Sequence, residues 1–132
     1  MPFVHPLRVR FVDTDMSGRI HYSAMLRHFE AAEQEFFRSL GSAKIHPISG
    51  GFGLPRVHVE CDFTSAVRYD DLLDIAVIVE RVGTTSLTLG FDATIEGRHA
   101  ARGKFIVVCM DFDTQKSRPF PEDLATALRN AC

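Results

Sequence analysis

The feature that most constrains this sequence is one long helical pattern followed by a series of long alternating segments. Apolar residues recur at steps of three and four residues over 23–40, which predicts an amphipathic helix. Ser23 is expected to cap its start, and Gly41 to end it in a left-handed conformation. After Pro55 the pattern changes to strict alternation of apolar and polar residues, which predicts strands.

The alternating segments predict about five strands that are joined mostly by short turns. Strands joined by tight turns are antiparallel neighbours, so we expect an α+β fold with a large antiparallel sheet against one helix. With 132 residues the chain is expected to form a single domain, residues 1–132. The expected strands are 7–12, 57–63, 72–82, 87–95 and 99–112, with a loop at 42–55 and a short final helix at 122–131.

Charge and composition argue against several classes of function. The net charge is -2, so no basic field would attract nucleic acid or an anionic membrane. No apolar run is long enough to span a bilayer, and we expect no signal peptide at the start of the chain. Cys61, Cys109 and Cys132 are odd in number and lack Cys-x-x-Cys spacing, which favours a reducing, cytoplasmic location over a disulfide framework or a zinc site.

The loop that leads into the predicted helix holds the candidate chemistry. Asp13 and Asp15 lie in it, shortly before the helix start. A helix N-terminus offers unpaired N–H groups and a partial positive charge, which can hold a developing oxyanion, while a nearby carboxylate acts as base or nucleophile. This combination suits acyl transfer. Both carboxylates also fit a bland interpretation, in which they only accept local hydrogen bonds in a turn.

The same loop invites a calcium interpretation, which fails on spacing. The order Asp13-x-Asp15-x-Ser17-Gly18 copies the opening of an EF-hand loop. Such a loop requires a bidentate glutamate at its twelfth position, and that position is Ala24 here. We therefore expect no metal site.

Several motifs of the chain recur in a known family. They are Phe11-Val12-Asp13-Thr14-Asp15-Met16-Ser17-Gly18, Phe29-Glu30-Ala31-Ala32-Glu33, Gly53-Leu54-Pro55, Phe63 and Tyr69-Asp70-Asp71-Leu72. On these motifs the sequence resembles the 4-hydroxybenzoyl-CoA thioesterase branch of the hotdog-fold superfamily, from about residue 7 to residue 128.

The resemblance implies a hotdog fold and the hydrolysis of an acyl- or aroyl-CoA thioester to a free acid and coenzyme A. Asp15 is then the catalytic carboxylate, the backbone N–H of Tyr22 polarises the thioester carbonyl, and Gly18 lets the loop pass close to the substrate. The family site lies between two subunits, so the resemblance implies a homodimer or homotetramer. It implies no cofactor, with coenzyme A present only as part of the substrate.

The chain departs from the family pattern near the substrate. Arg19 and Met25 stand where many relatives carry other residues, and the turn at 83–85 lacks a basic cluster that meets CoA phosphates in some relatives. These departures leave the acyl group and the mode of CoA binding open.

Four further residues are candidate substrate contacts. They are His21, beside the expected carbonyl donor, and the cations Arg68, Arg102 and Lys104, which suit phosphate groups. His21 is also compatible with a role as a wall residue of the site that has no direct part in the reaction, and each cation is compatible with an ordinary solvent-exposed charge.

Two other functions remain open at this stage. One is a non-catalytic hotdog module that binds an acyl-CoA or an acyl carrier. The other is a hotdog dehydratase, which would need a His paired with a carboxylate, such as His21 with Asp15. A thiol-release assay over a panel of acyl-CoA thioesters separates the three.

Overall fold

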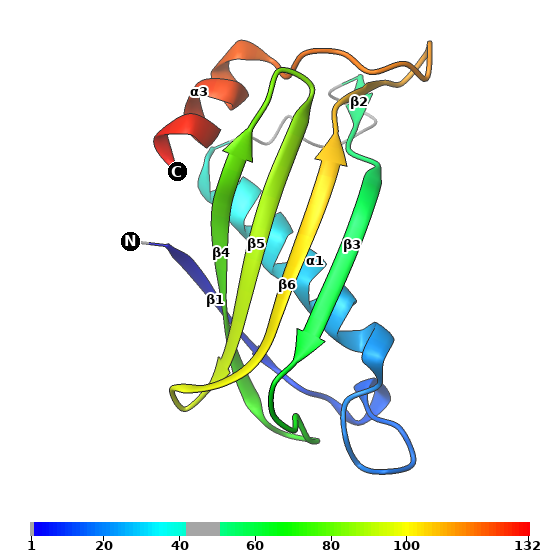
Figure 1. The fold of residues 1–132 in the computed structure, drawn as a ribbon, viewed down its shortest axis with the longest axis vertical. Helices are drawn as coiled ribbons and strands as arrows, with labels where there is room; N and C mark the ends of the chain where they lie inside the picture. Colours follow the sequence, from blue (N-terminus) through cyan, green and yellow to red (C-terminus); the bar gives the residue numbers. More distant parts are fainter. Residues whose placement is uncertain (1, 42–50) are drawn as a thin grey trace.

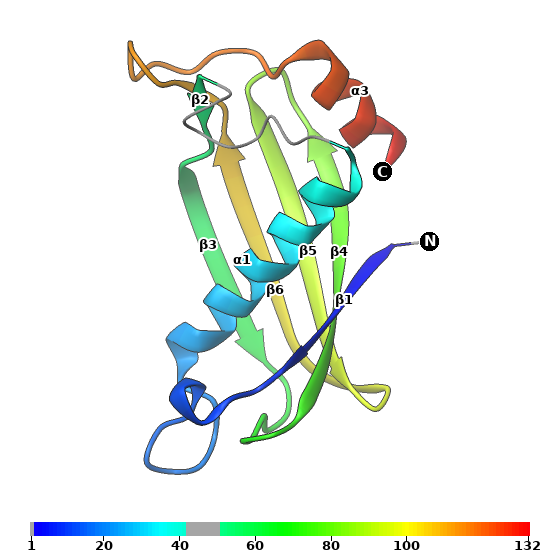
Figure 2. The ribbon, with the colours of Figure 1, turned by 180° about the vertical axis from the view of Figure 1, so that it is seen from behind.

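The chain folds into one large antiparallel sheet with a long helix across one of its faces (Figures 1 and 2). A computed structural model describes residues 2–41 and 51–132. The five strands of the sheet lie in the order β1-β4-β5-β6-β3. This arrangement confirms the predicted α+β hotdog fold. The elements are β1 (Phe3–Arg8), α1 (Tyr22–Ser39), β3 (Arg56–Phe63), β4 (Leu72–Val82), β5 (Ser86–Ile95) and β6 (Arg98–Val108).

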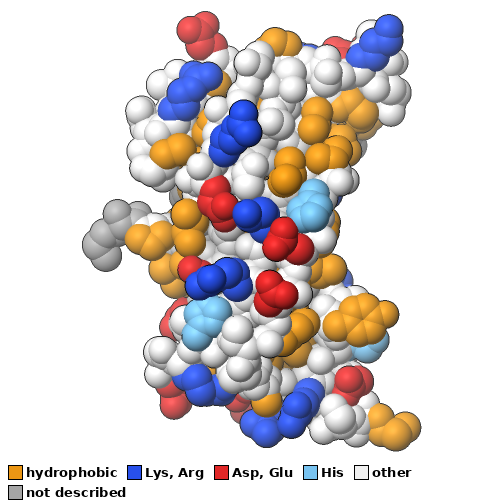
Figure 3. All heavy atoms as spheres, viewed as in Figure 1, with side chains coloured by type: hydrophobic (Ala, Val, Ile, Leu, Met, Phe, Trp, Pro, Cys, Tyr) orange, Lys and Arg blue, Asp and Glu red, His pale blue; other side chains and the backbone are white. Residues whose placement is uncertain are grey.

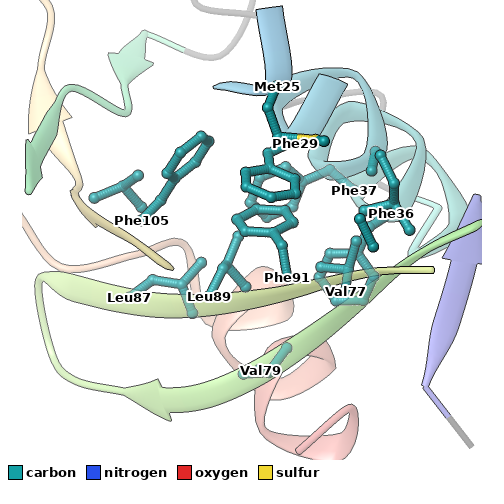
Figure 4. Packing of buried hydrophobic residues seen from close by; sticks show 14 of the residues in the cluster. Met25, Phe29, Phe36, Phe37, Val77, Val79, Leu87, Leu89, Phe91 and Phe105 are labelled. Carbon is teal, nitrogen blue, oxygen red and sulfur yellow. The ribbon is translucent and has the colours of Figure 1, made fainter. Parts of the chain in front are cut away.

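Helix α1 supplies one half of the core and the sheet supplies the other. The ring of Phe29 stacks on the ring of Phe91 from β5, with centroids 4.9 Å apart, and Phe105 from β6 packs edge-on against Phe91 at 4.8 Å (Figure 4). Gly103 lies under this stack, because a Cβ atom there would overlap the Phe29 ring. The close approach of helix and sheet therefore depends on a position without a side chain.

The two ends of α1 follow different rules. Gly41 has a φ of +75°, which confirms the predicted left-handed end of the helix. The predicted cap at Ser23 is wrong, because the helix begins at Tyr22 and its cap is His21. The ring Nδ1 of His21 accepts the N–H of Ser23 at 3.2 Å, so an imidazole replaces the usual short hydroxyl or carboxylate cap.

The first predicted strand is shifted along the chain. β1 ends at Arg8, and a short 3-10 helix, η1 (Phe11–Asp13), takes the place of the predicted strand end. The Oδ2 atom of Asp13 accepts the backbone N–H of Arg10 at 2.9 Å, which turns the chain out of the sheet. A local side-chain hydrogen bond therefore overrides the alternating pattern.

The second half of the chain follows the prediction more closely. β4 has the predicted limits, and β5 differs only by beginning at Ser86. The predicted strand 99–112 is interrupted, since β6 ends at Val108 and a separate short strand, β7 (Met110–Asp111), pairs with β2 (Phe52–Gly53). A final helix, α3 (Glu122–Asn130), confirms the prediction for 122–131. Of the predicted loop 42–55, residues 42–50 lie outside the described part of the chain.

Strand β3 is an outer strand whose apolar face is only partly covered. Val59 lies opposite Phe105 in the sheet, so its side chain projects toward the face that α1 occupies. Even so, Val59 is 42% exposed and Phe63 is 44% exposed. The sheet therefore ends in an edge with apolar side chains beside it.

Candidate active site

The two carboxylates of the loop before α1 have different environments. Asp13 is buried, and besides the Arg10 N–H its Oδ2 lies 3.3 Å from Nε2 of His28 on α1. Its backbone carbonyl accepts the N–H of His21 at 2.8 Å. Asp13 thus ties η1 to the start of the helix and is a structural residue of the loop.

Asp15 is exposed and is held by the turn that follows it. Its Oδ1 accepts two hydrogen bonds from Ser17, from the hydroxyl at 2.5 Å and from the backbone N–H at 2.8 Å. These bonds, the hydroxyl first, lower the pKa of Asp15 below its ordinary value of 3.8. Asp15 is therefore an ionised carboxylate at neutral pH, and both hydrogen bonds from Ser17 are accepted by Oδ1 and not by Oδ2.

Gly18 closes this turn. It has a φ of +80°, and its N–H donates to the carbonyl of Asp15 at 3.0 Å. A Cβ atom at Gly18 would meet no other atom within 4 Å, so the position needs glycine for its backbone conformation and not for lack of space.

The start of α1 presents backbone N–H groups beside the carboxylate. The N–H of Ser23 is taken by the His21 ring and the N–H of Ala24 by the His21 carbonyl. Among residues 2–41 and 51–132, no acceptor is found for the N–H of Tyr22. The first N–H groups of a helix have no partner within the helix, so this donor is available to a ligand.

Asp15 and Tyr22 line one open hollow of about 390 Å³. Residues 63–67, at the end of β3 and the start of its connection to β4, also line the hollow, and of this connection only the neighbouring Arg68 was expected from the sequence to contact the substrate. A long-range pairing brings this segment to the loop before α1: the Ile20 N–H donates to the Val67 carbonyl at 2.8 Å. The lining residues are Asp15, Arg19, Ile20, Tyr22, Phe63, Thr64, Ser65, Ala66 and Val67.

His21 lies beside this hollow without lining it. Its Nδ1 is engaged with Ser23, and its ring stacks on the Tyr22 ring with centroids 4.4 Å apart. His21 therefore positions the start of the helix and the Tyr22 side chain, and no hydrogen bond between His21 and Asp15 is found in the described part of the chain.

The candidate cations fall into two groups. Arg68 lies on the segment that pairs with Arg19, next to the hollow. Arg102 and Lys104 lie on the outer face of the sheet, where Arg102 is 3.2 Å from Asp92 and Lys104 is 3.3 Å from Glu80.

Figure 3 shows Lys and Arg side chains next to Asp and Glu side chains across the middle of this outer face. The structure thus brings Arg68 toward Asp15, whereas Arg102 and Lys104 line a separate hollow of about 340 Å³. Their role as CoA contacts stays a prediction.

Comparison with known proteins decides the family. The model of the thioesterase-like superfamily matches residues 9–128. The chain belongs to the thioesterase-like superfamily. The matched range of this thioesterase-like chain contains the Asp15 loop, the start of α1 and the whole lining of the hollow.

Individual members of the superfamily are similar along most of their length. The chain is 28% identical over 119 residues to the 1,4-dihydroxy-2-naphthoyl-CoA hydrolase of Synechococcus sp. (strain RCC307), covering 86% of this chain and 91% of that protein. It is 24% identical over 131 residues to the acyl-CoA thioesterase YbgC of Haemophilus influenzae, covering 97% and 95%. The crystal structure of Slr0204, a 1,4-dihydroxy-2-naphthoyl-CoA thioesterase from Synechocystis, superposes with a TM-score of 0.90 at 22% identity, covering 98% and 97%.

Proposed function

We propose that this chain hydrolyses acyl-CoA or aroyl-CoA thioesters to a free acid and coenzyme A. The observation that carries the proposal is the hollow lined by both an ionised carboxylate, Asp15, and Tyr22, whose helix N–H has no acceptor within residues 2–41 and 51–132. The family match and the thioesterase relatives support the same reaction.

Each group has a defined part in the proposed reaction. The Tyr22 N–H donates to the thioester oxygen and stabilises the negative charge that develops there. Asp15 either takes a proton from water, which attacks the carbonyl carbon, or attacks that carbon itself and forms a mixed anhydride that water then cleaves. In both routes the carbon–sulfur bond breaks, and the coenzyme A thiolate leaves and takes up a proton.

Asp15 fits both routes. Its lowered pKa makes it a weak base that is fully ionised at neutral pH, and the two bonds from Ser17 are accepted by Oδ1 and not by Oδ2. Isotope-labelled water can reveal the anhydride route, because a solvent oxygen enters the Asp15 carboxylate only when water cleaves the anhydride at the Asp15 carboxyl carbon.

We further propose that the enzyme is a homodimer or homotetramer in which the outer strand β3 meets a second copy. β3 is an outer strand of the sheet, and the exposed side chains of Val59 and Phe63 lie beside that edge. Phe63 also lines the hollow with Asp15, so pairing at this edge would bring the second copy to the site. Light scattering that shows a monomer at micromolar concentration would contradict this assembly.

We also propose a cytoplasmic location for the protein and a substrate contact at Arg68. Cys61, Cys109 and Cys132 are all free thiols, which suits the reducing cytoplasm. No helix in the described ranges is long and apolar enough to cross a membrane. Arg68 is the candidate CoA contact that lies nearest to the hollow, since it is paired with Arg19.

A thiol-release assay over a panel of short, branched, aromatic and dicarboxylic acyl-CoA thioesters tests the proposed function. We expect release of coenzyme A from at least one class, with saturation kinetics. Tight binding of an acyl-CoA without turnover would indicate a binding module instead. Loss of water from a hydroxyacyl-CoA, without thiol release, would indicate a dehydratase.

A further inference from the structure

Two arginines face each other across a short ladder at the edge of the hollow. Arg19 and Arg68 form an antiparallel bridge, flanked by a hydrogen bond from Ile20 N–H to the Val67 carbonyl at 2.8 Å. Ile20 and Val67 are buried. Because neighbouring side chains on paired strands alternate, Arg19 and Arg68 project to the opposite, exposed side of this ladder.

Neither guanidinium group takes part in an ion pair within residues 2–41 and 51–132, where ten ion pairs between basic and acidic side chains are found. The acids that follow Arg68 are engaged elsewhere. Asp71 accepts the backbone N–H of Arg68 at 2.7 Å, and Asp70 lies 3.7 Å from the guanidinium of Arg8.

Like charges directly opposite each other on paired strands destabilise the pairing. An anion between the two guanidinium groups would remove that repulsion, and the planar donor fork of arginine suits a carboxylate or a phosphate. The pair therefore has the chemistry of an anion site, because neither guanidinium group is neutralised by an ion pair with an acid in the described part of the chain.

The position of the pair selects the source of the anion. Arg19 lines the hollow together with Asp15, and the Asp15 N–H donates to the Arg19 carbonyl at 2.9 Å. The phosphates of coenzyme A are separated from the thioester by the long pantetheine arm. An anion that lies beside the reacting carbonyl is therefore carried by the acyl group.

We propose that Arg19, supported by Arg68, binds a carboxylate on the acyl group, so that the preferred substrates are thioesters of dicarboxylic acids. This inference rests on the proposed thioesterase function and specifies its substrate class. The Arg19 guanidinium also offsets the repulsion between the substrate carboxylate and the ionised Asp15.

Glutaryl-CoA and valeryl-CoA form a matched pair of substrates, because their acyl chains have the same length and differ only in the terminal carboxylate. We expect the wild-type enzyme to have the higher kcat/KM with glutaryl-CoA. A charge-assisted hydrogen bond corresponds to about a tenfold to hundredfold change in that ratio. Arg19→Gln should therefore lower the ratio of kcat/KM for glutaryl-CoA to kcat/KM for valeryl-CoA by at least about tenfold.

Three further variants sharpen the test. Arg19→Lys keeps the charge but not the fork and should retain part of the preference. Arg68→Gln should lower it less than Arg19→Gln, since Arg68 lies outside the lining of the hollow. Arg129→Gln removes an exposed arginine from α3 and should leave kcat/KM unchanged for both substrates.

Glutaryl pantetheine, which lacks the nucleotide of coenzyme A, distinguishes the acyl carboxylate from the CoA phosphates. We expect Arg19→Gln to lose as much activity on this thioester as on glutaryl-CoA. An equal loss on glutaryl-CoA and valeryl-CoA, or no loss on glutaryl pantetheine, would overturn the inference and leave the thioesterase function standing. Failure of the wild-type enzyme to hydrolyse any of these thioesters would overturn both.

Discussion

Glu33 is a buried acid whose ionisation should set the pH dependence of stability. It lies in the middle of α1 with 1% exposure, and its Oε2 pairs with the guanidinium of Arg56 at the start of β3. Its Oε1 is buried and, in the described part of the chain, has no hydrogen-bond partner. Burial outweighs the attraction of Arg56 and raises the pKa of Glu33 from 4.5 to about 7.

The direction of the effect follows from proton binding in the two states. Between pH 4.5 and about 7 the folded protein holds a proton on Glu33 that the unfolded chain releases, so stability falls as the pH rises through this window. Each unit of pKa difference corresponds to about 1.4 kcal/mol, so the total loss is on the order of 3 kcal/mol. Below the window both states hold the proton, and above it neither does, so Glu33 adds no further slope there.

Urea unfolding at a series of pH values, at one protein concentration, measures this effect. We compare the wild-type protein with Glu33→Gln, which cannot ionise, and with Glu122→Gln, which removes an exposed carboxylate from the start of α3. The stability of the wild type relative to Glu33→Gln should fall by up to about 3 kcal/mol between pH 4.5 and pH 8. The difference between the wild type and Glu122→Gln should stay nearly constant. Parallel pH curves for the wild type and Glu33→Gln would refute the reasoning.

Two further predictions concern the packing of the core and of the active-site loop. Gly103→Ala places a methyl group in the Phe29 ring and should cost about 1–3 kcal/mol of unfolding free energy. Adding Phe29→Leu should recover part of that loss, and an unchanged melting temperature for Gly103→Ala alone would contradict the close packing in Figure 4. In the wild type, the buried Oδ2 of Asp13 accepts the Arg10 N–H and lies next to the His28 ring. Asp13→Asn weakens these contacts and should lower the free energy of unfolding by about 1–3 kcal/mol. Thermal melting measures this effect, and a variant as stable as the wild type would show that Asp13 does not anchor the loop.

The sequence predicts the elements whose pattern is set by burial on one face. The apolar residues of 72–82 predict β4 because every second residue from Leu73 to Val79 is buried in the core. The three- and four-residue steps before Gly41 predict α1 for the same reason. Patterns of this kind depend only on which face is covered, so they can be read from one sequence.

Local side-chain hydrogen bonds are where the pattern misleads. The alternating residues before Asp13 read as a strand, but the Asp13 carboxylate accepts the Arg10 N–H and turns the chain into η1. In the same way the ring of His21 caps α1 in place of Ser23. Both outcomes depend on the geometry of a single side chain, which a periodic pattern does not contain.

Some residues of the candidate site follow from a local sequence pattern, and others depend on long-range contacts. Asp15 and Tyr22 are near each other in sequence, and both line the hollow, whereas Gly18 closes the turn after Asp15 and is not among the lining residues. The wall at 63–67 and the pairing of Arg19 with Arg68 depend on contacts between distant segments, which no local pattern reveals.

The burial of Glu33, in contrast, is indicated by the sequence pattern itself. It lies four residues after Phe29 and four before Phe37, on the stripe of α1 that faces the sheet. A charged residue on that stripe predicts a buried ionisable group.

Asp15 is the proposed catalytic carboxylate, and the kinetics of Asp15→Asn test this role. The change keeps the shape of the side chain and removes both the base and the nucleophile. Because Asp15 is exposed and outside the core, the variant should melt like the wild type and bind substrate with a similar KM. We expect kcat to fall by about 10²–10⁴-fold on the best acyl-CoA substrate. A kcat within a few-fold of the wild-type value would show that Asp15 only shapes the loop, and would contradict the proposed mechanism.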